Sequence, residues 1–227
     1  MNKQLLNTLK VIFLGIEGAI FFLLLFDSFL RFLREYRNII CYIAVIICAL
    51  FALIFTLKGK EKRSYFLLFS FLFILIADYF LIFYDSAVGI YFFILTQLMY
   101  QLFIKRFKLL VFFFLSGLGL LLFTLLLNHL VSLNIDLSST LPASFYYGIQ
   151  IFNIISLLIL IKKGRDKKEI FVLLGLVFLF FCDTSIGLYN LTSLRLFNDL
   201  IWLFYLPSQS LIIYYLASIA KKGIKDN

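Results

Sequence analysis

The sequence predicts an all-α integral membrane protein, a bundle of eight transmembrane helices whose N and C termini both face the cytoplasm. Three observations lead to this prediction. The chain of 227 residues is 63% hydrophobic and only 15% charged, whereas a soluble domain is about 45–50% apolar and about 25% charged. Its apolar residues form eight runs of about 20 residues, the length that crosses the hydrocarbon core of a bilayer as a helix. Basic residues gather at alternate ends of these runs.

The eight runs are predicted to be helices because a helix satisfies its own backbone hydrogen bonds in lipid. The chain has only two prolines, and it lacks the alternation of polar and apolar residues that a transmembrane β-barrel needs. The runs are Val11–Leu30, Ile39–Leu57, Tyr65–Tyr84, Ala87–Ile104, Leu109–Leu127, Ala143–Ile161, Ile170–Tyr189 and Asp199–Ile219. No soluble domain separates them, so residues 1–227 are predicted to form a single domain.

Lysine and arginine assign the orientation of the bundle. Seventeen of the 21 Lys and Arg residues lie before the first run, after the last run, or between runs two and three, four and five, or six and seven. The other side has only Arg31, Arg34, Arg37 and Arg195. Because basic loops stay in the cytoplasm, both termini are predicted there, and the plasma membrane is the predicted location. The net charge of +9 is spread over five segments, which fits contact with anionic membrane lipid and argues against a nucleic-acid partner.

Four charged residues near the first two runs leave alternatives open. Arg31, Arg34 and Arg37 fit either a short helical turn at the interface or a contact with headgroup phosphate, which arginine binds through two parallel hydrogen bonds. Glu17 lies inside the first run. It is expected either to pair with another helix or to face water near the cytoplasmic edge.

Two aspartates lie inside apolar runs, where a carboxylate is unfavourable by at least about 2.5 kcal/mol. Asp78 is 15 residues beyond Arg63, and Asp183 is 15 residues beyond Lys168. At about 1.5 Å per residue, both lie about 22 Å from the cytoplasmic edge. Their two runs point in the same direction. The sequence therefore predicts the two carboxyl groups at one level, in the outer half of the membrane.

Two buried carboxyl groups near each other cannot both ionise easily, because burial and like charge disfavour the second ionisation. Such a pair retains one acid and one base at neutral pH, which general acid–base catalysis requires. Asp78 and Asp183 are therefore the candidate catalytic residues. The alternative is structural, with each aspartate separately hydrogen-bonded to a neighbouring helix.

Three other runs carry polar and aromatic residues at helical spacing, which places each set on one face of its helix. The sets are Gly89, Phe93, Gln97 and Tyr100; Tyr146, Gln150 and Asn153; and Tyr205 with Gln209. Tyrosine and glutamine prefer the bundle interior to lipid, so these faces are expected to point inward. The candidate substrate-binding residues are Phe93, Gln97, Tyr100, Tyr146, Tyr205 and Gln209. Ordinary contacts between helices are the alternative.

The sequence predicts no metal and no organic cofactor. A single histidine, His129, cannot build a zinc site. The three cysteines, Cys41, Cys48 and Cys182, lie in apolar runs without metal-ligand spacing, and they are predicted to be small packing residues.

These residues, taken in order, resemble the YhhN family of eight-helical membrane proteins, which includes the lysoplasmalogenases. The family has an Asp on its third helix, the pattern G-x3-F-x3-H-x2-Y on its fourth, a second Asp on its seventh, and Tyr-Tyr-x-x-Gln on its eighth. The matching residues are Asp78, Gly89, Phe93, Tyr100 and Asp183, with Tyr205 and Gln209 matching to within one position. The resemblance covers the chain from Tyr65 onward, and the first two runs match in hydropathy alone.

The chain departs from the family pattern at four places. Ala77 replaces a Gly, Cys182 replaces a Ser, and the Lys-Pro that opens the second helix of the family appears as Arg37-Asn38. Gln97 stands where the family has His. Both aspartates are kept, whereas any role of the family's imidazole does not carry over to this chain.

The resemblance implies hydrolysis of the vinyl-ether bond of a lysoplasmalogen, which releases a fatty aldehyde and a glycerophospho-base. A vinyl ether is activated by protonation at carbon, so a neutral Asp would serve as the acid, and a carboxylate would orient or deprotonate the attacking water. The expected partners are this lysophospholipid and membrane lipid. Two alternatives remain open: a transporter or lipid-binding protein whose aspartates carry protons or cations, and a membrane sensor or assembly subunit without chemistry.

Overall fold

The computed structural model describes residues 3–33, 35–84, 86–104, 119 and 137–223. Across these ranges the chain forms helices and turns. The elements are α1 (Lys3–Leu30), α2 (Arg37–Gly59), α3 (Ser64–Phe83), α4 (Ser86–Ile104), α6 (Leu137–Lys162), the short 3-10 helix η1 (Lys167–Glu169), α7 (Ile170–Thr192) and α8 (Arg195–Gly223). The predicted run Leu109–Leu127, apart from residue 119, and the histidine His129 lie outside the described residues.

The described helices are those of a membrane protein. Within the described ranges, six helical segments are long and apolar enough to cross a bilayer: Gln4–Ser28, Arg37–Gly59, Ser64–Phe83, Phe145–Lys162, Lys167–Asn190 and Arg195–Lys221. Val88–Ile104 is a shorter apolar helix. The prediction of a helical membrane protein is therefore confirmed, while the count of eight spans, the cytoplasmic termini and the identity of the membrane stay predictions.

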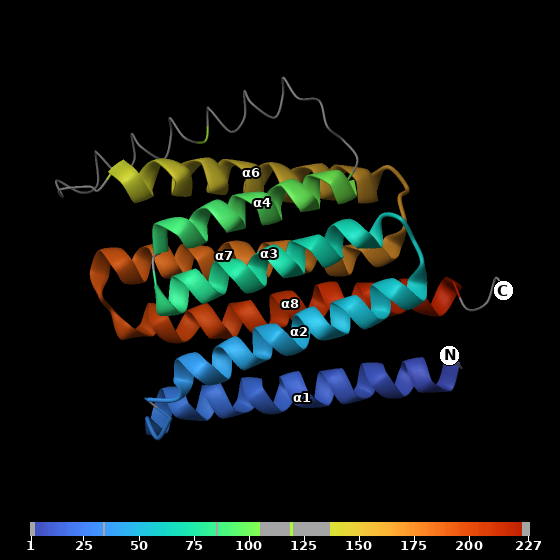
Figure 1. The fold of residues 1–227 in the computed structure, drawn as a ribbon. Helices are drawn as coiled ribbons and strands as arrows, with labels where there is room; N and C mark the ends of the chain where they lie inside the picture. The colour runs from blue at the N-terminus through green and yellow to red at the C-terminus, as the bar shows by residue number, and fades with distance from the viewer. Residues whose placement is uncertain (1–2, 34, 85, 105–118, 120–136, 224–227) are drawn as a thin grey trace.

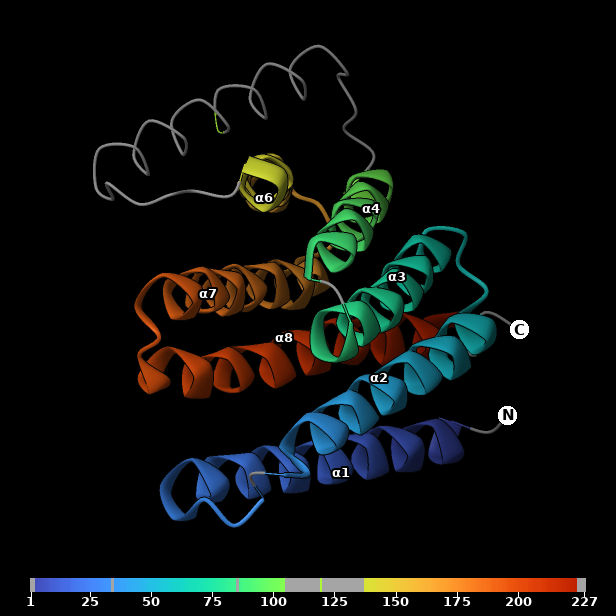
Figure 2. The ribbon, with the colours of Figure 1, turned by 60° about the vertical axis from the view of Figure 1, so that its left-hand side comes forward.

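The helices lie side by side in a bundle (Figure 1). Helix α8 packs against α7, α2 and α1, and α4 packs against α3 and α6. Figure 2 shows α1 and α6 on opposite sides of the described bundle. Helix α1 begins where α8 ends, and the connections 58–63 and 162–168 lie at the same end (Figure 1). We call this the basic end, since both connections are rich in lysine and arginine.

Most helices extend beyond the apolar runs that predicted them. Helix α1 begins at Lys3 rather than Val11, and α8 runs from Arg195 to Gly223 rather than over Asp199–Ile219. Polar residues at the ends of an apolar run can continue the helix into the interface between membrane and water. Because they are polar, hydropathy does not detect these ends of the helix. Pro207 lies inside α8, which continues on both sides of it.

At Gly175, α7 and α8 approach each other closely. A Cβ atom placed there would lie 2.7 Å from Cγ1 of Ile212 and 2.9 Å from the backbone oxygen of Ser208. Both distances are shorter than van der Waals contact, and a backbone oxygen on a helix cannot move aside easily. The contact between α7 and α8, which carry Asp183 and Tyr205, therefore depends on the absence of a side chain at this position.

Replacing Gly175 by Ala is expected to destabilise the folded protein by about 1–3 kcal/mol, because an extra methyl group strains a packed interface. Gly18→Ala is the matched control, since a Cβ at Gly18 meets no atom within 4 Å. The control is expected to be neutral or stabilising by up to about 1 kcal/mol through helix propensity. Equilibrium unfolding in mixed detergent micelles measures both variants, and equal stabilities would contradict the close approach.

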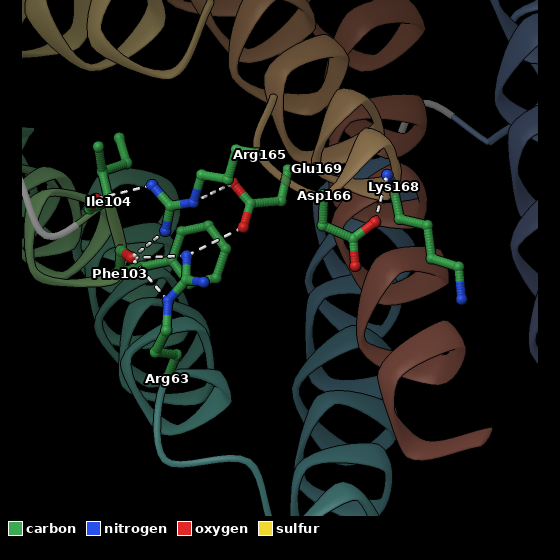
Figure 3. A network of polar contacts seen from close by, with 7 residues as sticks. All are labelled: Arg63, Phe103, Ile104, Arg165, Asp166, Lys168 and Glu169. Atoms are coloured by element: carbon green, nitrogen blue, oxygen red, sulfur yellow. Dashed lines mark hydrogen bonds and ion pairs between the residues drawn. The ribbon is translucent and has the colours of Figure 1, made fainter. Parts of the chain in front are cut away.

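A buried ion-pair network holds the basic end together (Figure 3). Glu169 is fully buried and binds the guanidinium groups of Arg63, at 3.0 Å, and Arg165, at 2.9 Å. The same two arginines donate hydrogen bonds to the backbone oxygens of Phe103 and Ile104, where α4 ends. Among the described residues these carbonyl groups have no partner in α4, so the arginines cap this end of α4 while Glu169 neutralises the two guanidinium groups. We call these five residues the arginine clamp.

At the opposite end, arginines that break the basic pattern have acidic partners. Arg37 begins α2 and lies 3.0 Å from Asp199 and 3.9 Å from Asp27. Arg195 lies 3.7 Å from Asp199. These contacts link α1, α2 and α8, and they give Arg37 a structural role, while the interfacial turn and the headgroup contact stay predictions. Arg34 lies outside the described residues.

Candidate functional site

Asp78 lies on α3, buried in the bundle with 4% of its surface exposed. Its carboxylate accepts a hydrogen bond from the hydroxyl group of Tyr205 on α8. Tyr205 is also buried, and the ring of Trp202 packs against it edge to face, with 5.5 Å between ring centroids. A buried carboxylate is costly unless it finds donors. The phenol of Tyr205 thus explains how α3 tolerates an acid in an apolar segment.

Asp183 lies on α7 and is held from α6. Its Oδ2 atom accepts a hydrogen bond from the Tyr146 hydroxyl at 2.5 Å and another from the Gln150 amide at 2.8 Å. Tyr146 and Gln150 are four positions apart and share one face of α6. Both are buried, as is Asp183. The second aspartate therefore has two donors on one oxygen, whereas the described contacts give Asp78 a single donor.

A chain of amide groups extends the Asp183 site to α4. Gln97 donates to the Tyr146 hydroxyl at 3.3 Å, and its own Oε1 accepts from Asn153 at 2.8 Å. Asn153 in turn accepts a hydrogen bond from Gln101. Gln97, Gln101 and Asn153 are all fully buried. These hydrogen bonds connect α4 to α6 and hold Tyr146, which in turn binds Asp183 on α7.

Asp78 and Asp183 lie within electrostatic range of each other, although no hydrogen bond among the described residues joins their carboxyl groups. Cys182, next to Asp183 in the chain, also lies within electrostatic range of Asp78. The structure therefore places Asp78 and Asp183 in one region of the bundle interior. Each has its own tyrosine, Tyr205 for the first and Tyr146 for the second.

The predicted face of α4 points into the bundle. Phe93 packs against Tyr146 with 5.9 Å between ring centroids, and Tyr100 is completely buried. At Gly89 a Cβ atom would lie 3.0 Å from the backbone oxygen of Ala77, so the missing side chain lets α4 approach α3 beside Asp78. The α4 positions identified from spacing thus lie in the interior rather than toward lipid.

Gln209 and Tyr100 are candidates that the described hydrogen bonds do not join to either aspartate. The Gln209 amide donates to the hydroxyl of the adjacent Ser208 at 3.2 Å, and its Oε1 atom is buried without a described partner. The Oε1 atoms of Gln101 and Gln150 are also buried without a described partner.

Gln101 belongs to the network but is not among the candidates that the sequence predicts. Gln150 and Asn153 are predicted to face the interior with Tyr146, but not to bind substrate. The signal for Gln101 was its spacing of four from Gln97, which places both amides on one helix face. A glutamine buried in an apolar helix is as informative as an aspartate, because it too must find partners.

Replacing Tyr205 by Phe is expected to destabilise the protein by about 1–3 kcal/mol, because Asp78 stays buried and loses its described donor. Tyr91→Phe is the matched control: it removes the same hydroxyl from a side chain that is 56% exposed. Unfolding in mixed micelles, followed through Trp202 fluorescence, gives both values. A Tyr205→Phe variant as stable as the control would mean that the hydrogen bond carries no net free energy.

Glu17 on α1 forms a separate buried pair with Cys48 on α2. The thiol donates to Oε1 of Glu17 at 3.4 Å, while Oε2 is buried without a described partner. Glu17 is 3% exposed, so of its two predicted alternatives the structure favours the pairing with another helix.

The site is built of carboxyl, phenol and amide groups from α3, α4, α6, α7 and α8, which together can donate, accept and relay protons in an apolar interior. Among the described residues, no group of three or more His, Cys, Asp and Glu side chains is placed to hold a metal ion. Comparison with protein-family models, with curated proteins and with solved structures returned no match.

Proposed function

We propose that the chain is a membrane lipid hydrolase that cleaves the vinyl-ether bond of lysoplasmalogens. The observation that carries the proposal is the pair of buried aspartates, Asp78 and Asp183, each of which accepts a hydrogen bond from a tyrosine hydroxyl. Two such carboxyl groups in a medium of low dielectric favour one neutral and one ionised member. A vinyl ether needs both, one to give a proton and one to receive it.

The proposed reaction proceeds through a hemiacetal and four proton transfers. The neutral carboxyl group protonates the outer carbon of the vinyl-ether double bond, which leaves an oxocarbenium ion at the carbon that bears the oxygen. Water attacks that carbon while the ionised carboxylate accepts its proton. The bond from the hemiacetal carbon to the glycerol oxygen then breaks: the glycerol oxygen takes the proton that came from water, and the hemiacetal hydroxyl gives its proton to the carboxylate that protonated the carbon. The products are a fatty aldehyde and the glycerophospho-base, both carboxyl groups return to their starting states, and one water molecule is consumed in each turnover.

The hydrogen bonds favour one assignment of roles. Asp183 accepts hydrogen bonds from both Tyr146 and Gln150, whereas the described donor to Asp78 is Tyr205 alone. Donors stabilise the ionised form of a carboxyl group. We therefore assign the base to Asp183 and the acid to Asp78.

The substrate's position follows from its shape. A lysoplasmalogen has one chain, and its vinyl ether lies just below the headgroup, close to the depth predicted for the aspartates. The buried Oε1 atoms of Gln150 and Gln209 suit the attacking water and the free glycerol hydroxyl, because both need acceptors. Phe93 and Tyr146 offer aromatic surface to the hydrocarbon chain.

The decisive experiment measures aldehyde release by the purified protein in detergent micelles. A lysoplasmalogen is compared with the lysophospholipid of equal chain length that has a saturated alkyl ether in place of the vinyl ether. Aldehyde is expected from the vinyl ether alone, because a saturated ether offers no carbon to protonate. Failure of the wild-type protein to release aldehyde from any headgroup form of the lysoplasmalogen would remove the proposal.

A proton- or cation-linked transporter is the second candidate, and Glu17 is the observation that favours it. An acid buried in a membrane helix with one oxygen unpartnered is typical of ion pathways. In liposomes, a transporter would show uptake that depends on the proton gradient and that Glu17→Gln abolishes. The hydrolase predicts instead that Glu17→Gln keeps aldehyde release near the wild-type rate.

A further inference from the structure

A hollow of about 230 Å³ opens at the basic end of the bundle, away from the aspartates. Three lysines from separate segments line it: Lys10 on α1, Lys168 in η1 and Lys221 on α8. The other lining residues are Leu6, Asn7, Phe171, Tyr214, Ala217 and Ser218. We call this hollow the lysine pocket.

The lysine pocket carries positive charge that the described residues do not neutralise. The described lining contains no acidic residue, and none of the ion pairs between described residues involves Lys10, Lys168 or Lys221. The arginine clamp nearby is different, since Glu169 serves both Arg63 and Arg165. Three ammonium groups around one concave surface repel each other, so the arrangement is favourable when an anion lies between them.

Aromatic rings form one wall of the pocket and hold one of the lysines. The ammonium nitrogen of Lys10 lies 3.4 Å from the centroid of the Tyr214 ring, a cation–π contact. Tyr214 in turn packs against Phe171 with 4.6 Å between ring centroids. The pocket thus combines preorganised positive charge with apolar surface and with polar groups of Asn7 and Ser218.

We propose that the lysine pocket binds a phosphate group, supplied either by an anionic phospholipid headgroup or by a small soluble phosphate compound. Lysine binds phosphate as a point charge from several directions, and three lysines supply more than enough positive charge to neutralise one phosphate group. The pocket is not part of the proposed hydrolase site, because Lys168 in its lining lies 15 residues before Asp183, or about 22 Å of helix. The proposal therefore stands independently of the hydrolase activity.

The test compares two triple variants that remove equal charge from the same end of the protein. The pocket variant is Lys10→Gln, Lys168→Gln and Lys221→Gln. The control variant is Lys58→Gln, Lys60→Gln and Lys62→Gln, whose lysines lie in or beside the connection between α2 and α3, outside the pocket lining. Lys168→Gln alone is included because Lys168 is exposed and its replacement does not disturb packing.

Two probes separate the sources of the phosphate. Phosphatidylglycerol is titrated into the detergent-solubilised protein and bound lipid is counted by native mass spectrometry, with phosphatidylcholine as the zwitterionic reference. Inorganic phosphate is titrated calorimetrically into the delipidated protein. The pocket variant is expected to lose about tenfold or more in affinity for the bound probe, and the control variant to keep the wild-type value. Selective lipid binding identifies a headgroup site, and binding of inorganic phosphate identifies a soluble ligand.

Two results would overturn the proposal. The first is that neither probe binds the wild-type protein. The second is that the pocket and control variants bind equally well, since the charge would then act without regard to position. If the pocket variant fails to fold, Lys168→Gln decides: a several-fold loss of affinity supports the pocket, and unchanged affinity rejects it.

Discussion

Replacing Asp78 by Asn is expected to slow aldehyde release from a lysoplasmalogen by about 10²–10⁴-fold, the usual contribution of a general acid or base. Asparagine keeps the size of the side chain and removes the transferable proton. Asp183→Asn is expected to cause a loss of similar size. Because the two groups act as a unit, the double variant should be no slower than the more impaired single variant. Initial rates of aldehyde formation at saturating substrate measure all three.

Deuterium separates the two roles that the hydrogen bonds assign. In heavy water, Asp183→Asn retains the acid Asp78, so it can protonate the double bond reversibly and place deuterium on the outer vinyl carbon of unreacted substrate. Asp78→Asn lacks the acid and is expected to show neither exchange nor hydrolysis. Mass spectrometry of recovered substrate detects the label. Exchange in Asp78→Asn and none in Asp183→Asn would reverse the assignment.

Glu17→Gln is the matched control for these substitutions. It makes the same change from carboxyl to amide in another buried acid, on α1 beside Cys48. Its rate is expected to stay within a few-fold of the wild-type rate. Equal losses in Glu17→Gln and Asp78→Asn would show that general damage to the bundle, rather than loss of catalytic groups, explains the effect.

Replacing Glu169 by Gln is expected to lower the free energy of unfolding by about 3 kcal/mol. Removing one partner of a buried ion pair costs about 3–5 kcal/mol, because the other charge is left uncompensated. The lower end of this range applies because the side chains of Arg63 and Arg165 are 21% and 17% exposed, whereas that of Glu169 is 1% exposed. Both guanidinium groups would keep their carbonyl partners on α4 and lose their neutralising anion.

Glu61→Gln is the control for the clamp. It removes one acid from the same end of the protein, from a partly exposed residue that takes part in none of the ion pairs between described residues. Its effect is expected to stay within about 0.5 kcal/mol, as for most surface substitutions. Unfolding in mixed micelles compares the two variants. A loss of equal size in both would attribute the effect to net charge rather than to the clamp.

The membrane helices could be predicted from the sequence because lipid imposes a simple rule on composition and length. Hydropathy located α2, α3 and α7 to within a few residues of their observed ends. It placed the start of α1 eight residues too late, at Val11 instead of Lys3. Residues 3–10 include Lys3, Asn7 and Lys10. Their polar side chains lower the mean hydropathy of this segment, so hydropathy does not reveal that its backbone is helical.

Counting residues from Arg63 and Lys168 predicts one level for Asp78 and Asp183, and their depth in the membrane stays a prediction. The partners of the two aspartates could not be predicted from the sequence. Tyr205 binds Asp78 across 127 positions of the chain, and Tyr146 binds Asp183 across 37. Both tyrosines were candidates from helical spacing, yet spacing within one helix does not indicate which neighbouring helix lies beside it.

Charge patterning had a similar limit at the two ends of the bundle. It identified Arg37 and Arg195 as exceptions to the basic pattern without indicating that Asp199 binds both. Arg63 and Arg165 were among the basic residues that assigned the cytoplasmic side. In the structure their guanidinium groups cap α4 and pair with Glu169. A count of charges by side treats each residue alone, whereas a buried ion pair depends on three-dimensional neighbours.

The separation of Arg63 from Glu169, 106 positions along the chain, has a consequence for biosynthesis. The ribosome makes the N-terminal part first, so α3 and α4 leave it long before η1 does. Throughout that interval the Arg63 side chain cannot form its ion pair with Glu169, and only water or lipid phosphate can stabilise its charge. Once Glu169 is made, it can pair with Arg63 and join the late helices to the early ones, and nascent chains released before that moment lack this anion.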